Sequence, residues 1–220
     1  NLAAVPFFAF LGGALTTVLV YKLGTGKSGT SVTIMLLAGV AISALSGAGI
    51  GYMNFVADDQ MLRDLSLWSM GSLAGANWSS ITLCTVTLVC LMLVFMRKAM
   101  ALNALLLGEA EASHLGIPVQ SLKRQLILLT AVGVGMTVSV SGMIGFIGLV
   151  IPHLGRMLTG PDHRTLLPIS ALMGALLLTL ADMYSRVAVA PAELPVGIVT
   201  AIIGAPFFIY LLFKQKGRIV

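Results

Sequence analysis

A basic, glycine-rich turn is the first feature with the residue types of a chemical site. Gly26, Lys27 and Ser28 resemble the end of a phosphate-binding loop. The complete pattern G-x-x-x-x-G-K-[ST] requires a glycine where this chain has Tyr21, and such a loop joins a strand to a helix. The turn here follows a long apolar run instead. Lys27 is therefore better interpreted as a charged anchor at a membrane boundary, and nucleotide binding is not predicted on this chain.

The histidines and cysteines form no recognisable reactive group. His114, His153 and His163 lack the spacing of a metal site, and no Ser/His/Asp or Cys/His arrangement accompanies them. Cys84 and Cys90 share one apolar run but face different directions on a helix, so neither a disulfide nor a metal site is expected. His153 is interpreted either as a hydrogen-bonded structural group or as part of an inner gate. We predict no catalytic residue, no metal and no cofactor on this chain, and it is not expected to be an enzyme.

The other ionisable groups avoid the middle of the apolar runs. Asp182, Arg186 and Glu193 gather near the ends of the last two runs, where an interfacial ion-pair cluster is the simplest interpretation. An intramembrane protease or a proton-driven pump requires ionisable groups deep within its spans. Because the deep positions are uncharged, both functions are disfavoured.

The segment Ala101–Gly116 carries the most informative polar groups. It reads ALNALLLGEAEASHLG, and Gly108 is expected to divide it into two short helices. Gly116 and Pro118 then provide a stop. Two interpretations remain open: an interfacial helix beneath the bilayer, or a docking element for a cytoplasmic partner. Its acidic residues favour the second, because anionic lipids attract Lys and Arg.

Long uncharged runs position these groups. Apolar residues make up 58% of the chain and charged residues 10%, whereas a soluble domain typically carries about 25% charged residues. A hydrocarbon core about 30 Å thick is crossed by roughly 20 apolar residues in a helix. The pattern predicts an all-α membrane helical bundle, one transmembrane domain over residues 1–220, with seven spans: Ala3–Tyr21, Val32–Val56, Ser79–Met96, Leu122–Val140, Gly142–Leu158, Leu166–Arg186 and Pro195–Phe213.

The Lys and Arg residues set the orientation. Eleven of the 13 lie in one set of loops and near the C-terminus, and only Arg63 and Arg186 lie on the other side. The positive-inside rule then makes the first loops, the insert at residues 99–121 and the C-terminus cytoplasmic. Seven spans place Asn1 outside, so we expect further helices before it. The net charge of +5 follows from this topology, and nucleic acid binding is not predicted.

Two further segments have simpler patterns. Asp58–Trp78, on the outer side, combines polar residues with spaced leucines and is expected to form a short amphipathic helix at the outer interface. Gly142, Gly145 and Gly148 recur every three residues, so they are expected to share one face of the fifth span. Small residues on one face permit close packing of helices in lipid.

Several segments together resemble one family. The chain is similar to the permeases of iron–siderophore, haem and cobalamin importers, which are the membrane subunits of type II ABC importers. The similarity is carried by MLLAGVAISA (35–44), LLLGEAEASHLGI (105–117), SGMIGFIGLVIPHLGR (141–156), PDHRTLLPISALMGALLLTLADMYSR (161–186) and AELPVGIVTAIIGAPFFIYLL (192–212). It runs in register over nearly the whole chain. It implies that the seven spans are the last seven of an expected ten.

The resemblance also implies partners. Such permeases form homodimers in the bacterial inner membrane, in contact with lipid, and bind two ATPase subunits inside and a substrate-binding protein outside. ATP and Mg²⁺ are then expected on the ATPase chain. Residues 99–121 become the coupling segment, with these residues at the ATPase contact: Leu107, Gly108, Glu109, Ala112, His114, Leu115 and Gly116.

Other residues are assigned to docking and gating in the same way. Arg186, and with a weaker match Arg63, are expected to grip acidic residues of the binding protein. The translocation path is expected at the dimer axis. The helix 32–56 and the short helix after it are expected to gate the path, through Ser31, Thr33, Leu65 and Met70.

The cargo is the least constrained expectation. The LRDL…W..GSL run within 58–78 is similar to haem importers, so haem comes first, followed by a ferric siderophore and then cobalamin. No histidine or tyrosine is placed by the sequence to ligate haem iron. An ion-driven secondary carrier is the alternative of a different class. That alternative leaves the coupling segment unexplained.

Overall fold

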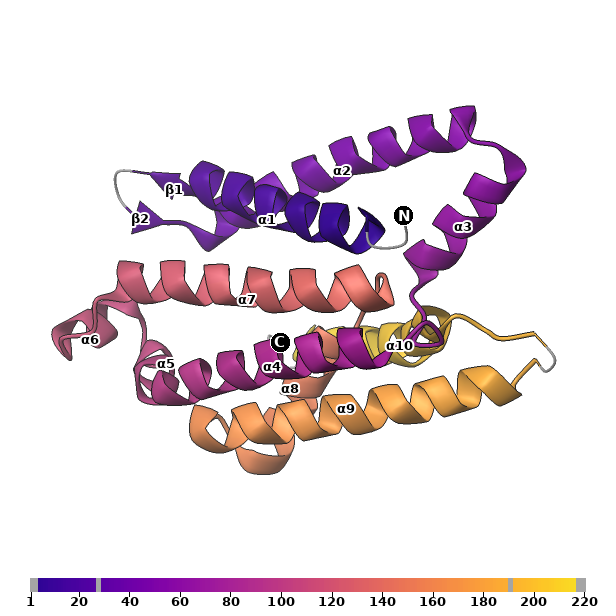
Figure 1. Cartoon of the computed structure of the whole chain (residues 1–220). Coiled ribbons are helices and arrows are strands. Elements are labelled where there is room, and N and C mark those ends of the chain that lie inside the picture. The colour runs from indigo at the N-terminus through magenta and orange to yellow at the C-terminus, as the bar shows by residue number, and fades with distance from the viewer. Residues whose placement is uncertain (1–3, 27–28, 190–191, 217–220) are drawn as a thin grey trace. The chain divides into compact units, whose positions relative to one another are not determined.

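The protein is a bundle of helices (Figure 1). The computed structural model describes residues 4–26, 29–189 and 192–216. Within these residues five helices are long and apolar enough to cross a membrane, namely α1 (Ala4–Gly24), α2 (Val32–Val56), α4 (Trp78–Arg97), α7 (Val119–Ser141) and α9 (His163–Val187). Two further apolar helices are α8 (Ile147–Thr159) and α10 (Val196–Lys216), and the apolar part of α10 is Val196–Leu211. These seven helices correspond to the seven predicted spans, and the all-α membrane fold is confirmed.

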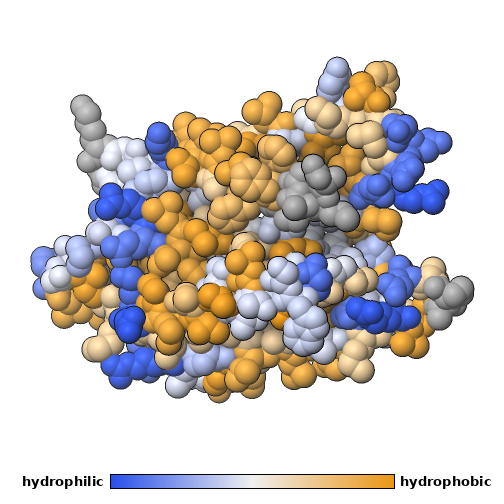
Figure 2. Space-filling view, viewed as in Figure 1, coloured by the Kyte–Doolittle hydropathy of each residue, from blue (hydrophilic) through white to orange (hydrophobic). Residues whose placement is uncertain are grey.

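Apolar side chains cover much of the surface. Figure 2 shows them over a large part of the visible face. Helix α2 has no buried residue, and Leu36, Val40 and Phe55 are among its strongly exposed side chains. A soluble protein rarely exposes contiguous apolar patches of this extent. The exposed apolar surface is therefore that of a multi-pass membrane protein.

The fifth span is shorter than predicted. Helix α8 begins at Ile147, not Gly142, and its 13 residues extend about 20 Å at 1.5 Å per residue. Gly142 has φ +70° and Phe146 has φ +66°, and both conformations lie outside the helical region. The predicted glycine face is therefore wrong. Gly142 lies before the helix against the backbone of Trp68, and nothing stands within 4 Å of a Cβ placed at Gly145 or Gly148.

Contacts divide the chain into two compact units. The first comprises Asn1–Ser66, Trp78–Leu91 and Ala104–Val140. In it α1 packs against α2, and a short antiparallel hairpin joins them, formed by β1 (Thr25–Gly26) and β2 (Gly29–Thr30). Helix α7 approaches its neighbours through glycines: Gly135 faces Phe10 of α1, and Gly133 faces Leu91 of α4. Small residues let the helices of this unit lie close together.

The second unit comprises Leu67–Asn77, Met92–Asn103 and Ser141–Val220. Helices α8, α9 and α10 pack against one another in it, and Ala181 of α9 forms a small buried core with Val196 and Val199 of α10. Gly197 of α10 lies against the carbonyl group of Met70, where a side chain would collide with backbone. That glycine therefore lets the start of α10 approach the end of the preceding short helix.

The short helix predicted within 58–78 is present as α3 (Asp59–Met70). Asp58 precedes it, and its Oδ1 accepts a hydrogen bond of 2.8 Å from the backbone N–H of Met61. A side-chain acceptor at this position satisfies one of the unpaired N–H groups of the first turn. The start of α3 thus follows from a local sequence signal.

Candidate coupling site

The insert between α4 and α7 folds as two short helices. They are α5 (Ala99–Leu105) and α6 (Glu109–His114), and the predicted break at Gly108 is confirmed. Gly108 has φ +108°, a conformation that side chains other than hydrogen disfavour. Gly116 has φ +82° and follows α6, and Pro118 leads into α7. The glycine positions therefore set both turns of the insert.

A small apolar core holds the two short helices against α7. Its buried members are Ala104, Ala112 and Val119, and Leu105 and Ile117 pack around them. Ala112 is 0% exposed. Such a core fixes the direction of α6, because three elements must move together to keep it filled.

The outer surface of the insert is apolar at its two turns. Leu107 is 66% exposed and Leu115 is 64% exposed, and His114 and Glu111 are exposed between them. Ala112, which the family resemblance places at the partner contact, lies inside the core instead. Its side chain supports α6 from within and leaves the outward surface to the residues around it.

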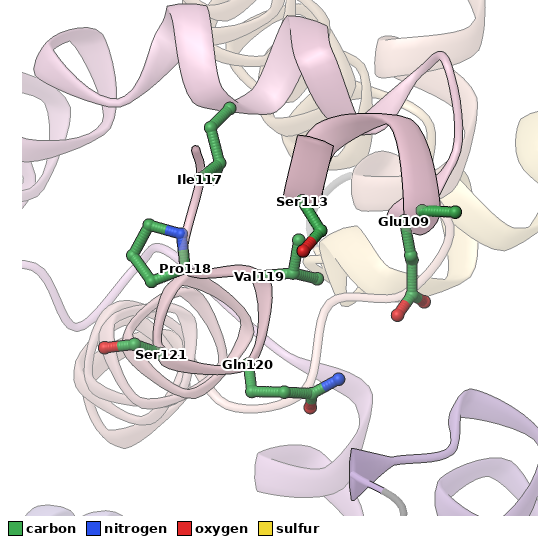
Figure 3. Close-up of a pocket in the computed structure, with 8 residues that line it drawn as sticks. Glu109, Ser113, Ile117, Pro118, Val119, Gln120 and Ser121 are labelled. Atoms are coloured by element: carbon green, nitrogen blue, oxygen red, sulfur yellow. The ribbon is translucent and has the colours of Figure 1, made fainter. Parts of the chain in front are cut away.

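A pocket of about 400 Å³ lies between α6 and the first turn of α7. Figure 3 shows Glu109 and Ser113 projecting from α6, and Gln120 and Ser121 projecting from the first turn of α7. Ile117, Pro118 and Val119 form the connecting wall, and Ala110 completes the lining. The pocket thus combines an apolar wall with carboxylate, hydroxyl and amide groups.

Lys123 of α7 joins this pocket to the hairpin. Its Nζ forms an ion pair with Oε1 of Glu109 and also donates a hydrogen bond of 3.3 Å to the backbone carbonyl of Thr30. The Lys123 side chain is 14% exposed and that of Glu109 is 54% exposed. A lysine this far removed from solvent requires such partners, because an unpaired charge there is costly.

Gln120 makes a second connection to the same hairpin. Its Oε1 accepts a hydrogen bond of 3.0 Å from the backbone N–H of Thr30. Gly29 has φ +104°, and a Cβ at that position would lie 2.7 Å from the Gln120 side-chain nitrogen. The amide of Gln120 is therefore packed directly on Gly29. Together Lys123 and Gln120 satisfy both backbone groups of Thr30, immediately before α2.

The other end of the insert is held by a different network. The Asn103 amide nitrogen donates to Asp162 Oδ1 over 2.7 Å, and its Oδ1 accepts from the His163 backbone N–H over 2.8 Å. His163 Nδ1 also lies 2.8 Å from Asn103 Oδ1. Asp162 caps α9 by accepting from the backbone N–H of Arg164. That hydrogen bond, and then the one from Asn103, lower the pKa of the Asp162 carboxyl below its ordinary value.

The residues assigned to docking and gating are not among those that line this pocket. Arg186 is 44% exposed, and its Nε donates to Asp182 Oδ2 over 2.8 Å one helical turn away, so part of the predicted ion-pair cluster is present. Arg63 and Thr33 are exposed. Ser31 caps α2, since its Oγ accepts from the backbone N–H of Ile34 over 3.4 Å.

The two other residues predicted for the gate lie on α3. Leu65 is exposed on it, and Met70 ends it.

His153 packs edge-on against Phe207 of α10, with ring centroids 6.3 Å apart. Lys27 and Ser28 lie outside the described residues. In the part of the chain that the structure describes, no three His, Cys, Asp or Glu side chains come together as a metal site requires.

Sequence reasoning missed three residues that hold the site. Lys123 was counted only as a topological charge, and Gln120 and Asn103 were not singled out. The one available signal was Asn103 itself, a polar residue within the otherwise apolar run ALNALLL. Its partners are about 60 positions further along the chain, so spacing alone does not identify them.

The sequence matches a known transport family and several of its members. The FecCD transport family matches residues 1–214. The chain is 46% identical over 208 residues to the hemin transport system permease protein of Yersinia pestis, covering 94% of this chain and 62% of that protein. It is 42% identical over 207 residues to the vitamin B12 import system permease protein of Vibrio cholerae, with coverage of 94% and 62%.

A solved structure gives the same picture of the fold. It is an ABC transporter assigned to the metal-chelate type, in an inward-facing conformation, with a TM-score of 0.82 and 34% sequence identity. The match covers 95% of this chain and 65% of that one. The chain thus spans somewhat less than two thirds of the length of the proteins that it matches. With the sequence match running from Asn1 into α10 and the helical bundle superimposing on a transporter, this chain belongs to the FecCD transport family.

Proposed function

We propose that the protein is the membrane-spanning permease subunit of an ATP-driven importer that moves an iron complex, with haem as the first candidate. It carries no catalytic residue in this proposal. ATP and Mg²⁺ bind on a separate ATPase chain, and the cargo arrives on a binding protein at the opposite face. The permease works as a homodimer in the inner membrane, with its C-terminus in the cytoplasm.

The observation that carries the proposal is the family match over residues 1–214, which includes the complete α5–α6 insert. An ion-driven carrier has no need for a rigid cytoplasmic insert of this kind. The insert exposes leucines at its turns beside acidic groups and keeps its own small core. Exposed apolar anchors rimmed by polar groups are typical of protein interfaces. These features support the insert as the ATPase contact.

The contact face in this proposal consists of the exposed members of the predicted set. Leu107 and Leu115 supply apolar anchors, Glu109 and His114 supply polar contacts, and Gly108 and Gly116 shape the turns. Ala112 supports α6 from the core. Transport then follows from differential binding, since the ATPase closes on ATP and favours one arrangement of the insert.

On the opposite face, Arg186 and Arg63 are proposed to dock acidic residues of the binding protein. Both side chains are exposed, as such a contact requires. The gate is proposed at the start of α2, through Ser31 and Thr33, and along α3, through Leu65 and Met70. The eleven-to-two distribution of basic residues supports this orientation.

Haem is proposed because the relative at 46% identity is named a hemin transport permease. A cobalamin or a ferric hydroxamate complex is the second candidate. Relatives at 42% and 38% identity are named permeases for vitamin B12 in Vibrio cholerae and for iron(3+)-hydroxamate in Bacillus subtilis. Because these identities are close to one another, the cargo is best assigned by measuring binding to the neighbouring substrate-binding protein.

The test is co-purification of the complete gene product, tagged at its C-terminus, in mild detergent. We expect an ATPase subunit in equal amount, and ATP-dependent uptake of haem once the binding protein is added to proteoliposomes. Leu115→Asp should remove the ATPase from the complex, since it places a charge at an apolar anchor. Leu158→Asp is the matched control, because Leu158 is similarly exposed at the end of α8. A permease that purifies alone, with uptake driven by an ion gradient, would contradict the proposal.

A further inference from the structure

Lys123 stands between two parts of the first compact unit that the proposed mechanism requires to move together. Its ammonium group contacts a carboxylate on α6 and a backbone carbonyl directly before α2. One part is the proposed ATPase contact, and the other is the proposed start of the gate. The link is a side-chain bridge between segments 93 positions apart in the sequence.

The contacts of Lys123 with Glu109 and with the Thr30 carbonyl are constrained. Lys123 is 14% exposed, so a change of partner would leave its charge poorly solvated. On the hairpin side, Thr30 is also held by Gln120, and the Thr25 and Thr30 hydroxyl oxygens lie 3.2 Å apart. The next residue, Ser31, has its N–H bonded to Gly24 and its hydroxyl capping α2. A displacement of Thr30 is therefore passed to the first turn of α2.

The α6 side is equally constrained. Glu109 begins α6, and Ala112 one turn later is fully buried in the core that α6 shares with α5 and α7. A partner that pushes on α6 cannot rotate the helix freely, because the core would open. The Glu109 carboxylate thus moves with α6, and the ammonium group that it binds is drawn with it.

We propose that Lys123 is a positioning residue that transmits displacement of α6 to the start of α2 through its simultaneous contacts with Glu109 and the Thr30 carbonyl. The proposal rests on the proposed function, since α6 is displaced by the ATPase. It assigns Lys123 no contact with cargo or nucleotide. Its effect is on the ratio of cargo transported to ATP hydrolysed.

The first measurement is that ratio, in proteoliposomes with ATPase and binding protein. Lys123→Met should keep the ATPase attached and hydrolysing ATP, while cargo moved per ATP falls by at least about fivefold, the lower end of typical coupling between sites. Lys123→Arg retains a cation that can reach both partners and should restore most of the ratio. Arg124→Met is the matched control, because it removes the same charge from the neighbouring exposed position. An unchanged ratio in Lys123→Met overturns the proposal.

Glu109→Gln is a second variant, in which the Lys123 ammonium group keeps its hydrogen bond to the Thr30 backbone carbonyl. It should lower the ratio, and combining it with Lys123→Met should cause no further loss, because both changes break the same bridge. Additive losses would mean that the two residues act separately and would also overturn the proposal.

The second measurement is hydrogen exchange of the backbone amides at residues 30–34, on the complete gene product alone in nanodiscs. We expect faster exchange in Lys123→Met than in wild type, and no change in Arg124→Met or Glu109→Gln. This readout needs neither ATPase nor cargo. If wild-type protein fails to take up cargo with ATP, the proposed function fails, and exchange alone then judges the bridge. Equal exchange in Lys123→Met and wild type would refute it.

Discussion

The two ends of the coupling insert are anchored by different chemistry. At the α5 end, Asn103 binds the cap of α9 through neutral hydrogen bonds and one carboxylate. At the α6 end, Lys123 forms an ion pair with Glu109 of α6, and Lys123 and Gln120 each form one hydrogen bond with the backbone of Thr30 in the hairpin before α2. The chain passes from the second compact unit to the first between Asn103 and Ala104, within α5. Each end therefore belongs to a different unit.

The two ends of the insert therefore have different roles in the proposed mechanism: the Asn103 network holds α5 in place, and the Lys123 bridge transmits motion of α6. Asn103 bonds to a helix cap that already satisfies its own first turn, so its network secures α5 in place. Lys123 bonds on one side to an exposed carboxylate and on the other to the hairpin before α2, so in the proposed mechanism its contacts respond to whatever binds α6. The predictions that follow test whether the two ends differ in this way.

The largest expected effect comes from reversing the charge on α6. Glu109→Arg places a second cation beside Lys123 and also alters the proposed ATPase face. We expect ATP-driven uptake to fall to background, while the protein still inserts and purifies. Uptake is measured in proteoliposomes, and Glu111→Arg, on the same short helix without the Lys123 contact, is the control. Normal ATP-driven uptake in Glu109→Arg would remove α6 from the coupling role.

The next effect compares two glycines with similar positive φ angles. Gly29 has φ +104° and Gly108 has φ +108°, but only Gly29 faces another group, the Gln120 amide. Gly108→Ala should therefore cost only backbone strain, about 1 kcal/mol, whereas Gly29→Ala adds a collision and should cost about 2–3 kcal/mol. The thermal midpoint in detergent measures both. Equal losses at the two positions would mean that Gln120 does not clasp the hairpin.

Local signals predicted much of the fold. Gly108 predicted the division of the insert, and Gly116 and Pro118 predicted its end, because each acts through its own backbone or the next turn. The start of α8 was mispredicted because Gly142 and Phe146 take non-helical conformations beside distant backbone. An apolar run contains no local signal for such a contact.

The site was predictable to a smaller extent. The insert and its exposed leucines were identified from residue pattern and family resemblance. The bridge formed by Lys123 was not predicted, because it depends on Thr30 lying beside α7. The family resemblance placed Ala112 at the ATPase contact, whereas its side chain is buried in the core of the insert. Tertiary packing supplied both answers.

The third prediction weakens the α5 end alone. Asn103→Leu keeps a similar volume but removes the bonds to Asp162 and His163, which should cost about 1–2 kcal/mol. We expect a lower thermal midpoint, and a ratio of cargo to ATP close to wild type, because α6 keeps its own bridge. Gln60→Leu, an amide-to-leucine change at an exposed position of α3, is the control. A loss of coupling as severe as in Lys123→Met would show that both ends transmit.

The smallest effect is the acid sensitivity of the α9 cap. The folded-state pKa of Asp162 is lowered, so its stabilising contribution is complete above the ordinary value of about 3.9 and is lost as the pH falls through the lower folded value. Asp162→Asn keeps a good capping residue but cannot titrate. The thermal midpoint of wild type minus that of this variant should be constant from about pH 6 to pH 5. It should decrease below about pH 4, because only wild type loses the contribution of the ionised Asp162 there. Parallel curves down to about pH 3 would mean that the cap does not hold Asp162 ionised, and the α5 end would then rest on the Asn103–His163 contacts alone.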